Sequence, residues 1–419
     1  MLARAIRPQL AEQYTDMLAK MYRSRRMLLS SYRHTLRDLV WCDRQILTHL
    51  EGMMSLKEQS SVYLRGQIQE PLSPGELFSV ALFAAGTDDE FLLSGCMGLA
   101  QALPRLLPVL FSVVDRMPEQ SGLWPQMMSL PTCRAYIAAT RNDRAASVVF
   151  SQRDLLALIE QGRCIDFLLY FLCRNASPLF VPALETVFSS GREELILQGC
   201  RAVLCSRPQA DNYTRTAISH LLLLAHSKNE DIRLAAVRHL LTHQAVTPRD
   251  FVRDLTEEDT DIRLLIKAMG WSGLPEYIPA LVAYFDEPEY ARLSALSVIS
   301  VTGSLPERDG WQCNKEKDVH RTVDSESADI PETDPEEGVS WPERAAFEQW
   351  WRVHQGDFAP DMPYLCGQLT TPEGLETVLK QGYLNLWPLA FMRMGQFSER
   401  ADRPAINQSL FLCPATKYP

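Results

Sequence analysis

Two histidines four residues apart are the pattern in this sequence that comes nearest to a metal site. His239 and His243 stand in one apolar helical stretch, and this spacing allows two imidazoles to share a metal ion. The residues between them lack the glutamate of an H-E-x-x-H metalloprotease, and no carboxylate or cysteine follows at a familiar ligand spacing. We therefore expect both histidines to be structural, and we predict neither a bound metal nor a cofactor.

Aromatic side chains near the C-terminus have types that could bind a carbohydrate or a peptide. The group consists of Trp341, Trp350, Trp351 and His354. Large aromatic rings also dominate the cores of small modules, so we expect these rings to pack the C-terminal module onto the preceding helices. Trp271, at the end of an apolar stretch, is expected to cap a helix or to contact a helix ridge.

Two arginines recur at equivalent places. Arg233 and Arg263 each follow an aspartate by two positions at the start of an apolar helix. The aspartates, Asp231 and Asp261, complement the positive end of the helix dipole. The arginines are expected to pair with acidic groups of an adjacent repeat, and such exposed pairs contribute only about 0–1 kcal/mol. Arg233 and Arg263, together with Trp271, Trp350, Trp351 and His354, are the candidate residues for contacts with a partner.

Familiar catalytic patterns are missing from the sequence. It contains no G-x-G-x-x-G or G-K-[ST] phosphate loop and no G-x-S-x-G nucleophile elbow. Cys96 falls inside a predicted helix, which disfavours a role as a nucleophile. The acidic turns Asp88-Asp89-Glu90 and Glu257-Glu258-Asp259 lack the regular ligand spacing of a calcium loop. We predict that the chain is not an enzyme.

The elements that carry these residues form an internal repeat of about thirty to forty residues. One kind of helix begins three times with a proline near its start, in the segments Leu107–Leu110, Val181–Leu184 and Ile278–Leu281. A second kind follows a short turn, most clearly from Asp231 and from Asp261. In the copy from Asp231, Ile232, Ala235, Ala236, Leu240 and Leu241 form one apolar stripe at helical spacing.

A single repeat could not bury such a stripe, whereas stacked copies make one continuous core. The Asp-x-Arg opening with a proline-initiated partner helix resembles a HEAT repeat. We therefore predict an all-α fold, a HEAT-like α-solenoid, with an N-terminal helical segment and a small C-terminal helical module. The predicted domains are an N-terminal helical segment at 1–75, repeats at 76–304, an acidic and disordered linker at 305–340, and a C-terminal helical module at 341–419. Strand signals are weak throughout.

Composition favours a protein of the cytoplasm. Hydrophobic residues make up 46% of the 419 residues, yet no apolar run reaches the length of a membrane-spanning helix. The start of the chain lacks the apolar core of a signal peptide. None of the ten cysteines forms a C-x-x-C pair, and Cys96, Cys164 and Cys200 lie on apolar helix faces, as expected for free buried thiols.

Charge is unevenly distributed along this acidic chain, whose net charge is −10. Residues 306–340 carry roughly eleven acidic against four basic side chains, which indicates a solvated tether. Residues 1–57 carry roughly ten basic against five acidic side chains. The basic cluster Arg23, Arg25 and Arg26 could touch nucleic acid, but the amphipathic pattern around it and the acidic chain disfavour that, so we predict no nucleic-acid partner.

Both ends of the chain carry a closer resemblance. His34-Thr35-Leu36-Arg37-Asp38-Leu39, Asp43 and His49-Leu50-Glu51-Gly52 resemble the N-terminal signature of an uncharacterised proteobacterial HEAT-repeat family. The closing module of that family is similar to the run Trp341-Pro342, Trp350-Trp351, His354, Phe358, Tyr364-Leu365, Gly367, Thr370 and Gly382. The last twenty or so residues depart from its usual helical ending. The family is often encoded in type VI secretion gene clusters and has no established catalytic residues to carry over.

Three functions follow as hypotheses. The first is a non-catalytic scaffold or adaptor that binds a protein partner, associated with type VI secretion through loading or assembly of a spike, sheath or effector. The second is an immunity-type protein that masks a toxic effector. The third is a HEAT-like DNA-repair glycosylase, which the excess of acidic side chains disfavours because the electrostatic attraction to DNA is lacking.

Overall fold

The computed structural model describes residues 2–118, 120–141, 148–206, 211–257, 261–313, 336 and 338–395. Almost all regular structure in these residues is helical, which confirms the predicted all-α class. None of the described helices combines the length and apolar character needed to cross a membrane. The chain divides into two compact units between His220 and Leu221, and each unit is described by itself.

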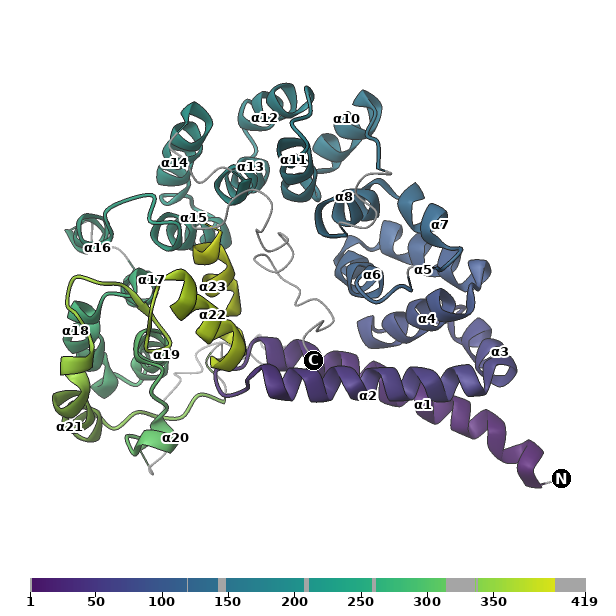
Figure 1. The fold of residues 1–419 in the computed structure, drawn as a ribbon, viewed down its shortest axis with the longest axis horizontal. Coiled ribbons are helices and arrows are strands. Elements are labelled where there is room, and N and C mark those ends of the chain that lie inside the picture. Colours follow the sequence, from purple (N-terminus) through teal and green to yellow (C-terminus); the bar gives the residue numbers. More distant parts are fainter. Residues whose placement is uncertain are drawn as a thin grey trace, which may run out of the picture. The chain divides into compact units, whose positions relative to one another are not determined.

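Unit 1 is built from helices and one 3₁₀ turn (Figure 1). Its elements are α1 (Leu2–Leu29), α2 (Leu36–Ser55), α3 (Lys57–Gln67), α4 (Pro74–Thr87), α5 (Glu90–Ala102), η1 (Pro104–Leu106), α6 (Leu107–Val114), α7 (Trp124–Ser129), α8 (Pro131–Thr140), α10 (Gln152–Gln161), α11 (Ile165–Arg174), α12 (Phe180–Phe188) and α13 (Glu193–Ser206). The next helix, α14 (Asn212–Leu224), contains the division between the units.

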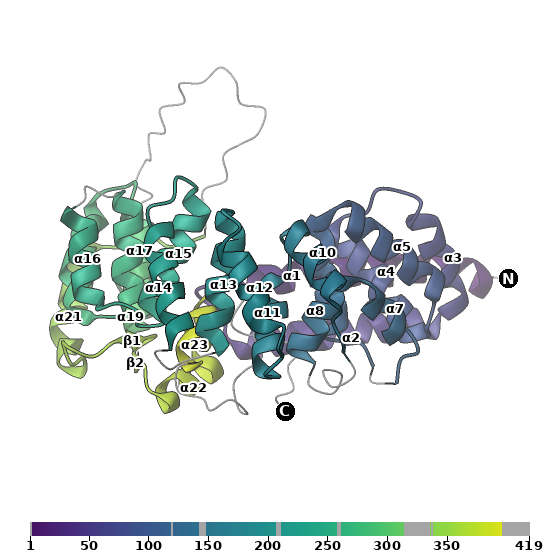
Figure 2. The same cartoon turned by 90° about the horizontal axis from the view of Figure 1, so that it is seen from above.

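Unit 2 combines helices with one small hairpin (Figure 2). Its elements are α15 (Glu230–Thr242), α16 (Pro248–Glu257), α17 (Ile262–Ser272), η2 (Pro275–Tyr277), α18 (Ile278–Ala283), η3 (Tyr284–Asp286), α19 (Ala291–Thr302), α20 (Pro306–Asp309), α21 (Arg344–His354), η4 (Gln355–Asp357), β1 (Tyr364–Leu365), β2 (Gln368–Leu369), α22 (Pro372–Gln381), η5 (Leu384–Leu386) and α23 (Trp387–Met394).

Alternate helices pack on one another in sequence order within each unit. In unit 1, α11 packs on α8 and on α13, and α12 bridges α11 and α13. In unit 2, α17 packs between α15 and α19, while α16 and α18 cover α17 and α19 from one side. This alternation buries the apolar stripe of each helix against its neighbours, as stacked helix pairs require. The stripe of α15 is buried at Ile232, Ala236, Leu240 and Leu241, whereas Ala235 is half-buried.

Local chemistry explains why the helices begin and end where they do. Ser73 caps α4 by accepting a hydrogen bond from the amide of Glu76, whose carboxylate accepts from the Ser73 amide in return. Pro74 occupies the first turn of α4, where a missing amide costs little. Asp261 caps α17 through the amide of Arg263, so it lies one position before the helix that we predicted it to open.

The N-terminal segment forms three helices. Leu36, Val40, Ile46 and Leu50 recur at apolar spacing in the sequence, but the buried face of α2 is shifted from this stripe. Of these four residues only Ile46 is buried, and the buried stripe continues through Leu39, Cys42 and Met53. The shift arises because α2 is covered on two sides, by α1 and by α4.

Both ends of the predicted linker are packed, which differs from the expected solvated tether. Trp311 is fully buried and stacks on Phe285 at 5.9 Å, and Phe347 of α21 meets its edge at 5.1 Å. Two backbone hydrogen bonds, from Cys313 to Trp341 and from Glu343 to Trp311, join the two ends of the segment in an antiparallel bridge. A single large aromatic residue outweighs the acidic composition here, because it buries a large apolar area. Residues 314–335 and 337 lie outside the described residues.

A hairpin lies in the module that we predicted to be helical. Strands β1 and β2 pair antiparallel, Tyr364 with Leu369 and Leu365 with Gln368. Cys366 and Gly367 form the two-residue turn, with φ angles of 53° and 75°. Two positive φ values match the right-handed twist of a hairpin. The Cys366-Gly367 pair is not the Asn-Gly or Asp-Gly pair typical of such turns, so the sequence carries no strong signal for the hairpin.

Candidate binding site at the ends of two stacked helices

Helices α17 and α19 end in the same way, about one repeat apart. Gly273 and Gly303 follow them with φ angles of 75° and 71°, the left-handed conformation that favours glycine. A Cβ atom at Gly273 would lie 2.5 Å from the carbonyl oxygen of Tyr364, and one at Gly303 would lie 2.7 Å from that of Cys366. Each of these two positions therefore requires glycine for two reasons: the left-handed turn, and the close approach of the hairpin backbone.

The hairpin supplies donors to the carbonyl groups at these helix ends. The amides of Cys366 and Gly367 donate to Ser300 and Val301 of α19, at 2.6 and 2.9 Å. The amide of Tyr364 donates to the carbonyl of Gly273 at 2.8 Å. The last carbonyls of a helix have no partner within the helix, so the hairpin satisfies groups that would otherwise need water. Figure 2 shows the hairpin between α19 and α22, in agreement with the contacts of β1 with α19 and of β2 with α22.

A buried arginine completes the end of α17. Arg393 of α23 donates from Nη2 to the carbonyls of Trp271 and Ser272, at 2.6 and 3.3 Å. A cation suits the negative end of a helix dipole. The side chain is only 3% exposed, and burial lowers the pKa of Arg393 to about 10.

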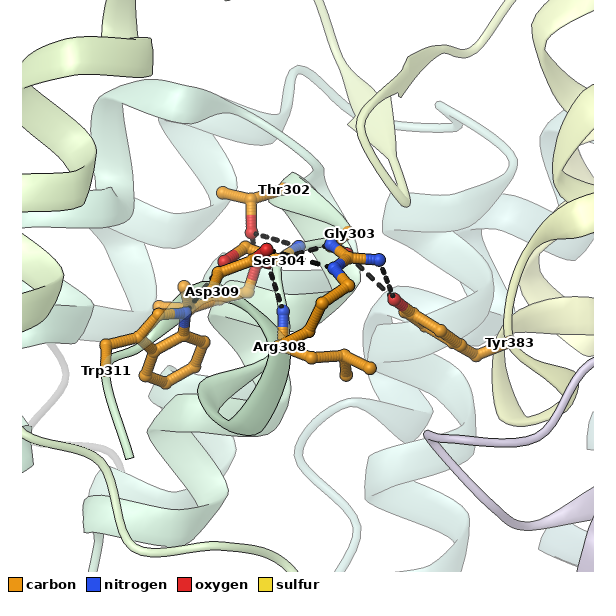
Figure 3. A network of polar contacts seen from close by, with 9 residues as sticks. Thr302, Gly303, Ser304, Arg308, Asp309, Trp311 and Tyr383 are labelled. Carbon is orange, nitrogen blue, oxygen red and sulfur yellow. Dashed lines mark hydrogen bonds and ion pairs between the residues drawn. The ribbon is translucent and has the colours of Figure 1, made fainter. Parts of the chain in front are cut away.

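An exposed arginine completes the end of α19. Arg308 donates from Nη2 to the carbonyl of Gly303 at 3.0 Å, and the hydroxyl of Tyr383 donates to the same carbonyl at 2.9 Å (Figure 3). Arg308 also grips both carboxylate oxygens of Asp309, at 2.9 and 2.8 Å, and donates to the Tyr383 hydroxyl at 3.2 Å. Its side chain remains 58% exposed. Four hydrogen bonds thus hold the Arg308 guanidinium in place, while much of the side chain is exposed to solvent.

The ionisable groups around Arg308 respond to this arrangement. Burial acts to raise the pKa of Asp309, but hydrogen bonds from Arg308 and from the Leu305 amide outweigh it and hold that pKa below the usual value. Burial raises the pKa of Tyr383 to about 12, against the lowering effect of Arg308. Asp309 is therefore an anion and Tyr383 a neutral donor at neutral pH.

A chain of hydrogen bonds ties the buried Trp311 to the same helix end. Its indole nitrogen donates to the Ser304 hydroxyl at 2.7 Å, and the Ser304 amide donates to the Thr302 hydroxyl at 3.2 Å (Figure 3). Thr302 in turn donates to the carbonyl of Val298 at 2.8 Å. These contacts fix the backbone that carries Arg308.

A pocket of about 380 Å³ opens beside Arg308. Its lining comes from the end of α19, from α20, α21 and η4, from the hairpin, and from α22 with the turn after it. The residues are Thr302, Gly303, Arg308, Trp350, His354, Asp357, Phe358, Cys366, Gly367, Gln368, Thr377, Val378, Gln381, Gly382 and Tyr383. The lining combines an aromatic wall with amide, hydroxyl and charged groups. Pockets that bind small groups or side chains with specificity have this mixture.

The aromatic wall of the pocket includes two of the predicted candidates. The rings of Trp350 and His354 stack 4.3 Å apart, and His354 Nδ1 lies 2.8 Å from the carbonyl oxygen of Trp350. Trp351 does not line the pocket and packs against Phe358 at 5.3 Å. The packing that we expected from these tryptophans is carried at its centre by Phe347, the buried residue of α21.

The other predicted residues lie away from this pocket. Trp271 contributes its carbonyl to Arg393 at the end of α17. Arg263 forms an ion pair with Glu336, and Arg233 is half-buried on α15. The rings of His239 and His243 are nearly parallel at 5.6 Å, and His239 is buried. Within the described ranges no group of three histidine, cysteine or acidic side chains could hold a metal ion.

The predicted basic cluster of the N-terminal segment lies in unit 1, and one of its members is not a surface residue. Arg25 is buried and binds Asp43 through Nε at 2.7 Å. Arg116, in the turn after α6, binds the same carboxylate oxygen at 2.9 Å. Arg25 therefore ties α1 to α2 and is not available to a polyanion.

Arg308, Tyr383, Arg393 and the Cys366-Gly367 turn are the site residues that sequence reasoning missed. A signal for the helix ends was present, because Gly273-Leu274-Pro275-Glu276 and Gly303-Ser304-Leu305-Pro306-Glu307 repeat one pattern of helix stop and restart. The arginines carried no local signal. Arg393 reaches the end of α17 from more than one hundred residues further along the chain.

Comparison with known proteins adds no family to this geometry: no protein-family model, curated protein or solved structure matches the chain.

Proposed function

We propose that the chain is a non-catalytic protein-binding scaffold, in which the pocket beside Arg308 receives a side chain of a partner protein. The observation that carries this proposal is the fixed geometry of the pocket. Arg308, Tyr383 and the Trp350–His354 wall are held by contacts within the chain. Groups that are positioned in advance lose little conformational entropy when a partner binds.

The resemblance of both ends of the chain to a type VI secretion-associated family supports a cellular setting. In this proposal the scaffold acts in the bacterial cytoplasm as an adaptor that loads or assembles a spike, sheath or effector. The proposal has two parts, namely binding through the pocket beside Arg308 and association with type VI secretion. One experiment addresses both.

The test is an affinity purification of the tagged chain from its host, followed by mass spectrometry, with two variants. Trp350→Ala removes the aromatic wall, whereas Val353→Ala changes a residue of the same helix that is 74% exposed and outside the pocket lining. We expect spike, sheath or baseplate proteins with the wild type and with Val353→Ala, and a loss of about tenfold with Trp350→Ala, as for an aromatic anchor.

Other outcomes are equally informative. Recovery of a single toxin in a one-to-one complex, with rescue of cells that express it, would replace the adaptor by an immunity protein. Equal recovery with both variants would remove the pocket from the proposal. If the wild type brings down no secretion component, the adaptor proposal fails.

A further inference from the structure

Three arginines occupy equivalent places on the stacked helices of unit 2. Arg233, Arg263 and Arg292 each precede a leucine near the start of α15, α17 and α19, at intervals of about thirty residues. Because α17 packs between α15 and α19, the three arginines form a row along one edge of the stack. We call these three residues the arginine row. The first two members were candidate contact residues on the sequence pattern, whereas Arg292 was not.

Glu336 is seated on two members of the arginine row. Arg263 binds its carboxylate through Nη2, and Arg292 donates from Nη1 to its main-chain carbonyl at 3.2 Å. Glu336 is buried, although acidic side chains are almost never buried without a partner. Arg292 is also held over the ring of Trp341, at 4.6 Å from the ring centroid. One repeat thus binds the side chain and the next binds the backbone of the same residue.

This mode of contact suits an extended peptide. Guanidinium groups bind carboxylates with two parallel hydrogen bonds and hold a planar geometry that lysine lacks. Adjacent packed helices lie about 8–10 Å apart, and an extended chain rises about 3.3 Å per residue. Carboxylates about three residues apart would therefore meet successive arginines of the row.

Glu336 contacts two members of the arginine row, and Arg233 is the member that it leaves without a contact. Arg233 is half-buried, and its Nε is a buried donor without a hydrogen-bond partner in the described part of the chain. The side chain as a whole is only half-buried and forms no ion pair with the described residues, so a carboxylate can bind its guanidinium from outside. Glu336 is bound by Arg263 and Arg292, so the arginine row has a third member that a longer acidic segment could reach.

We propose that the arginine row is a docking site for an extended acidic segment of a partner protein, with glutamates about three residues apart, and that Glu336 occupies part of this site from within the same chain. A partner must displace Glu336 to bind. The proposal gives the scaffold a second surface and does not depend on the pocket beside Arg308.

The test measures the binding of a fluorescein-labelled peptide, (Glu-Gly-Ser)4, to the full chain by fluorescence anisotropy. Glu336→Gln weakens the internal competitor, so we expect the affinity to rise by about threefold or more. In the Glu336→Gln background, Arg233→Ala is expected to lower the affinity by about tenfold, the effect of losing one charge-assisted contact. The peptide (Gln-Gly-Ser)4 should bind none of the variants.

Arg253→Ala is the matched control, because Arg253 is an exposed arginine of α16 paired with Asp250 and Asp254. It removes the same charge at another place and should leave the affinity unchanged. Arg263→Lys, checked by circular dichroism, keeps the charge and loses the planar fork, so it should weaken binding in a folded protein.

Equal losses with Arg233→Ala and Arg253→Ala would show attraction by net charge only and would overturn the proposal. An unchanged affinity with Glu336→Gln would also overturn it, because Glu336 would then be outside the site. Either failure leaves the purification experiment with Trp350→Ala unaffected, so the two proposals fail separately.

Discussion

The ends of α17 and α19 show two ways of meeting one requirement. Each helix stops at a glycine, each leaves carbonyl oxygens at its negative end, and each receives an arginine. At α17 the arginine is Arg393, which is 3% exposed and has a lowered pKa because it is buried. At α19 it is Arg308, which is 58% exposed and is neutralised by Asp309.

The difference separates a structural contact from an accessible one. Burial of Arg393 costs desolvation, and its hydrogen bonds to two carbonyls offset part of that cost. Arg308 keeps most of its hydration, so the pocket beside it can use the cation without unfolding the helix end. A repeated element can therefore be buried in one copy and accessible to solvent in the next.

The largest expected contrast comes from removing each arginine. Arg393→Ala leaves the carbonyls of Trp271 and Ser272 without a charged donor and opens a space in the core, so we expect a loss of about 3 kcal/mol in the free energy of unfolding. Arg308→Ala should cost about 1 kcal/mol or less, because its contacts are solvated. Urea unfolding followed by tryptophan fluorescence measures both. Equal costs would contradict the distinction between the two ends.

Replacing the glycine that follows α17 or α19 should cause the next largest loss in the free energy of unfolding. Gly273→Ala and Gly303→Ala force a left-handed conformation and a contact with the hairpin backbone, which we expect to cost about 2–3 kcal/mol each. Gly191 is the matched control, with a φ of 66° and no atom within 4 Å of the added Cβ. Gly191→Ala should cost only the strain, about 1 kcal/mol. Urea unfolding measures all three variants. Equal losses at the three positions would show that the hairpin backbone moves away from the added Cβ atom at little cost.

Removing one hydroxyl should have a smaller effect, confined to α19. Tyr383→Phe deletes the donor to the Gly303 carbonyl and the acceptor for Arg308, at an expected cost of about 1 kcal/mol. Tyr284→Phe serves as the control, because none of the hydrogen bonds of the described residues involves its hydroxyl. The midpoint of urea unfolding should move for the first variant and stay for the second.

Acid should loosen the end of α19 and leave that of α17 unchanged. The folded-state pKa of Asp309 lies below its ordinary value of 3.8, so its contribution to stability is present above that value and is lost as the pH falls through the folded pKa. As the pH falls below 3.8 we expect hydrogen-exchange protection to fall for the amides of Cys366 and Gly367 relative to that of Tyr364. Asp309→Asn should show the weaker protection at every pH. If protection falls equally at the two ends, acid acts through another group.

Part of this site could be read from the sequence, and part could not. The helices beginning at Leu107, Phe180 and Ile278 follow from proline placement and apolar period, which are local properties. The helical character of the C-terminal module and the aromatic group that α21 carries were also expected from the sequence. Glu336, Tyr383 and Arg393 reach their partners across long sequence separations, and their neighbours along the chain contain no trace of this.

Composition was also a weaker guide than a single side chain. The acidic stretch from Pro306 predicted a solvated tether, yet Trp311 is buried within it. A basic run at Arg23–Arg26 indicated a surface cluster, yet Arg25 is bound inside unit 1 by Asp43. In both places one long-range contact decided the structure, and average charge along a window does not report such contacts.

The bridge between Gln312 and Pro342 has a practical consequence for protein engineering. The two strands of this bridge are held side by side, because Cys313 and Glu343 are hydrogen-bonded to the opposite side of the bridge. The closure entropy of a loop grows only logarithmically, so doubling the length between these points costs roughly 0.6 kcal/mol. A longer segment between these two points is therefore expected to cost the folded module little free energy, which urea unfolding would measure.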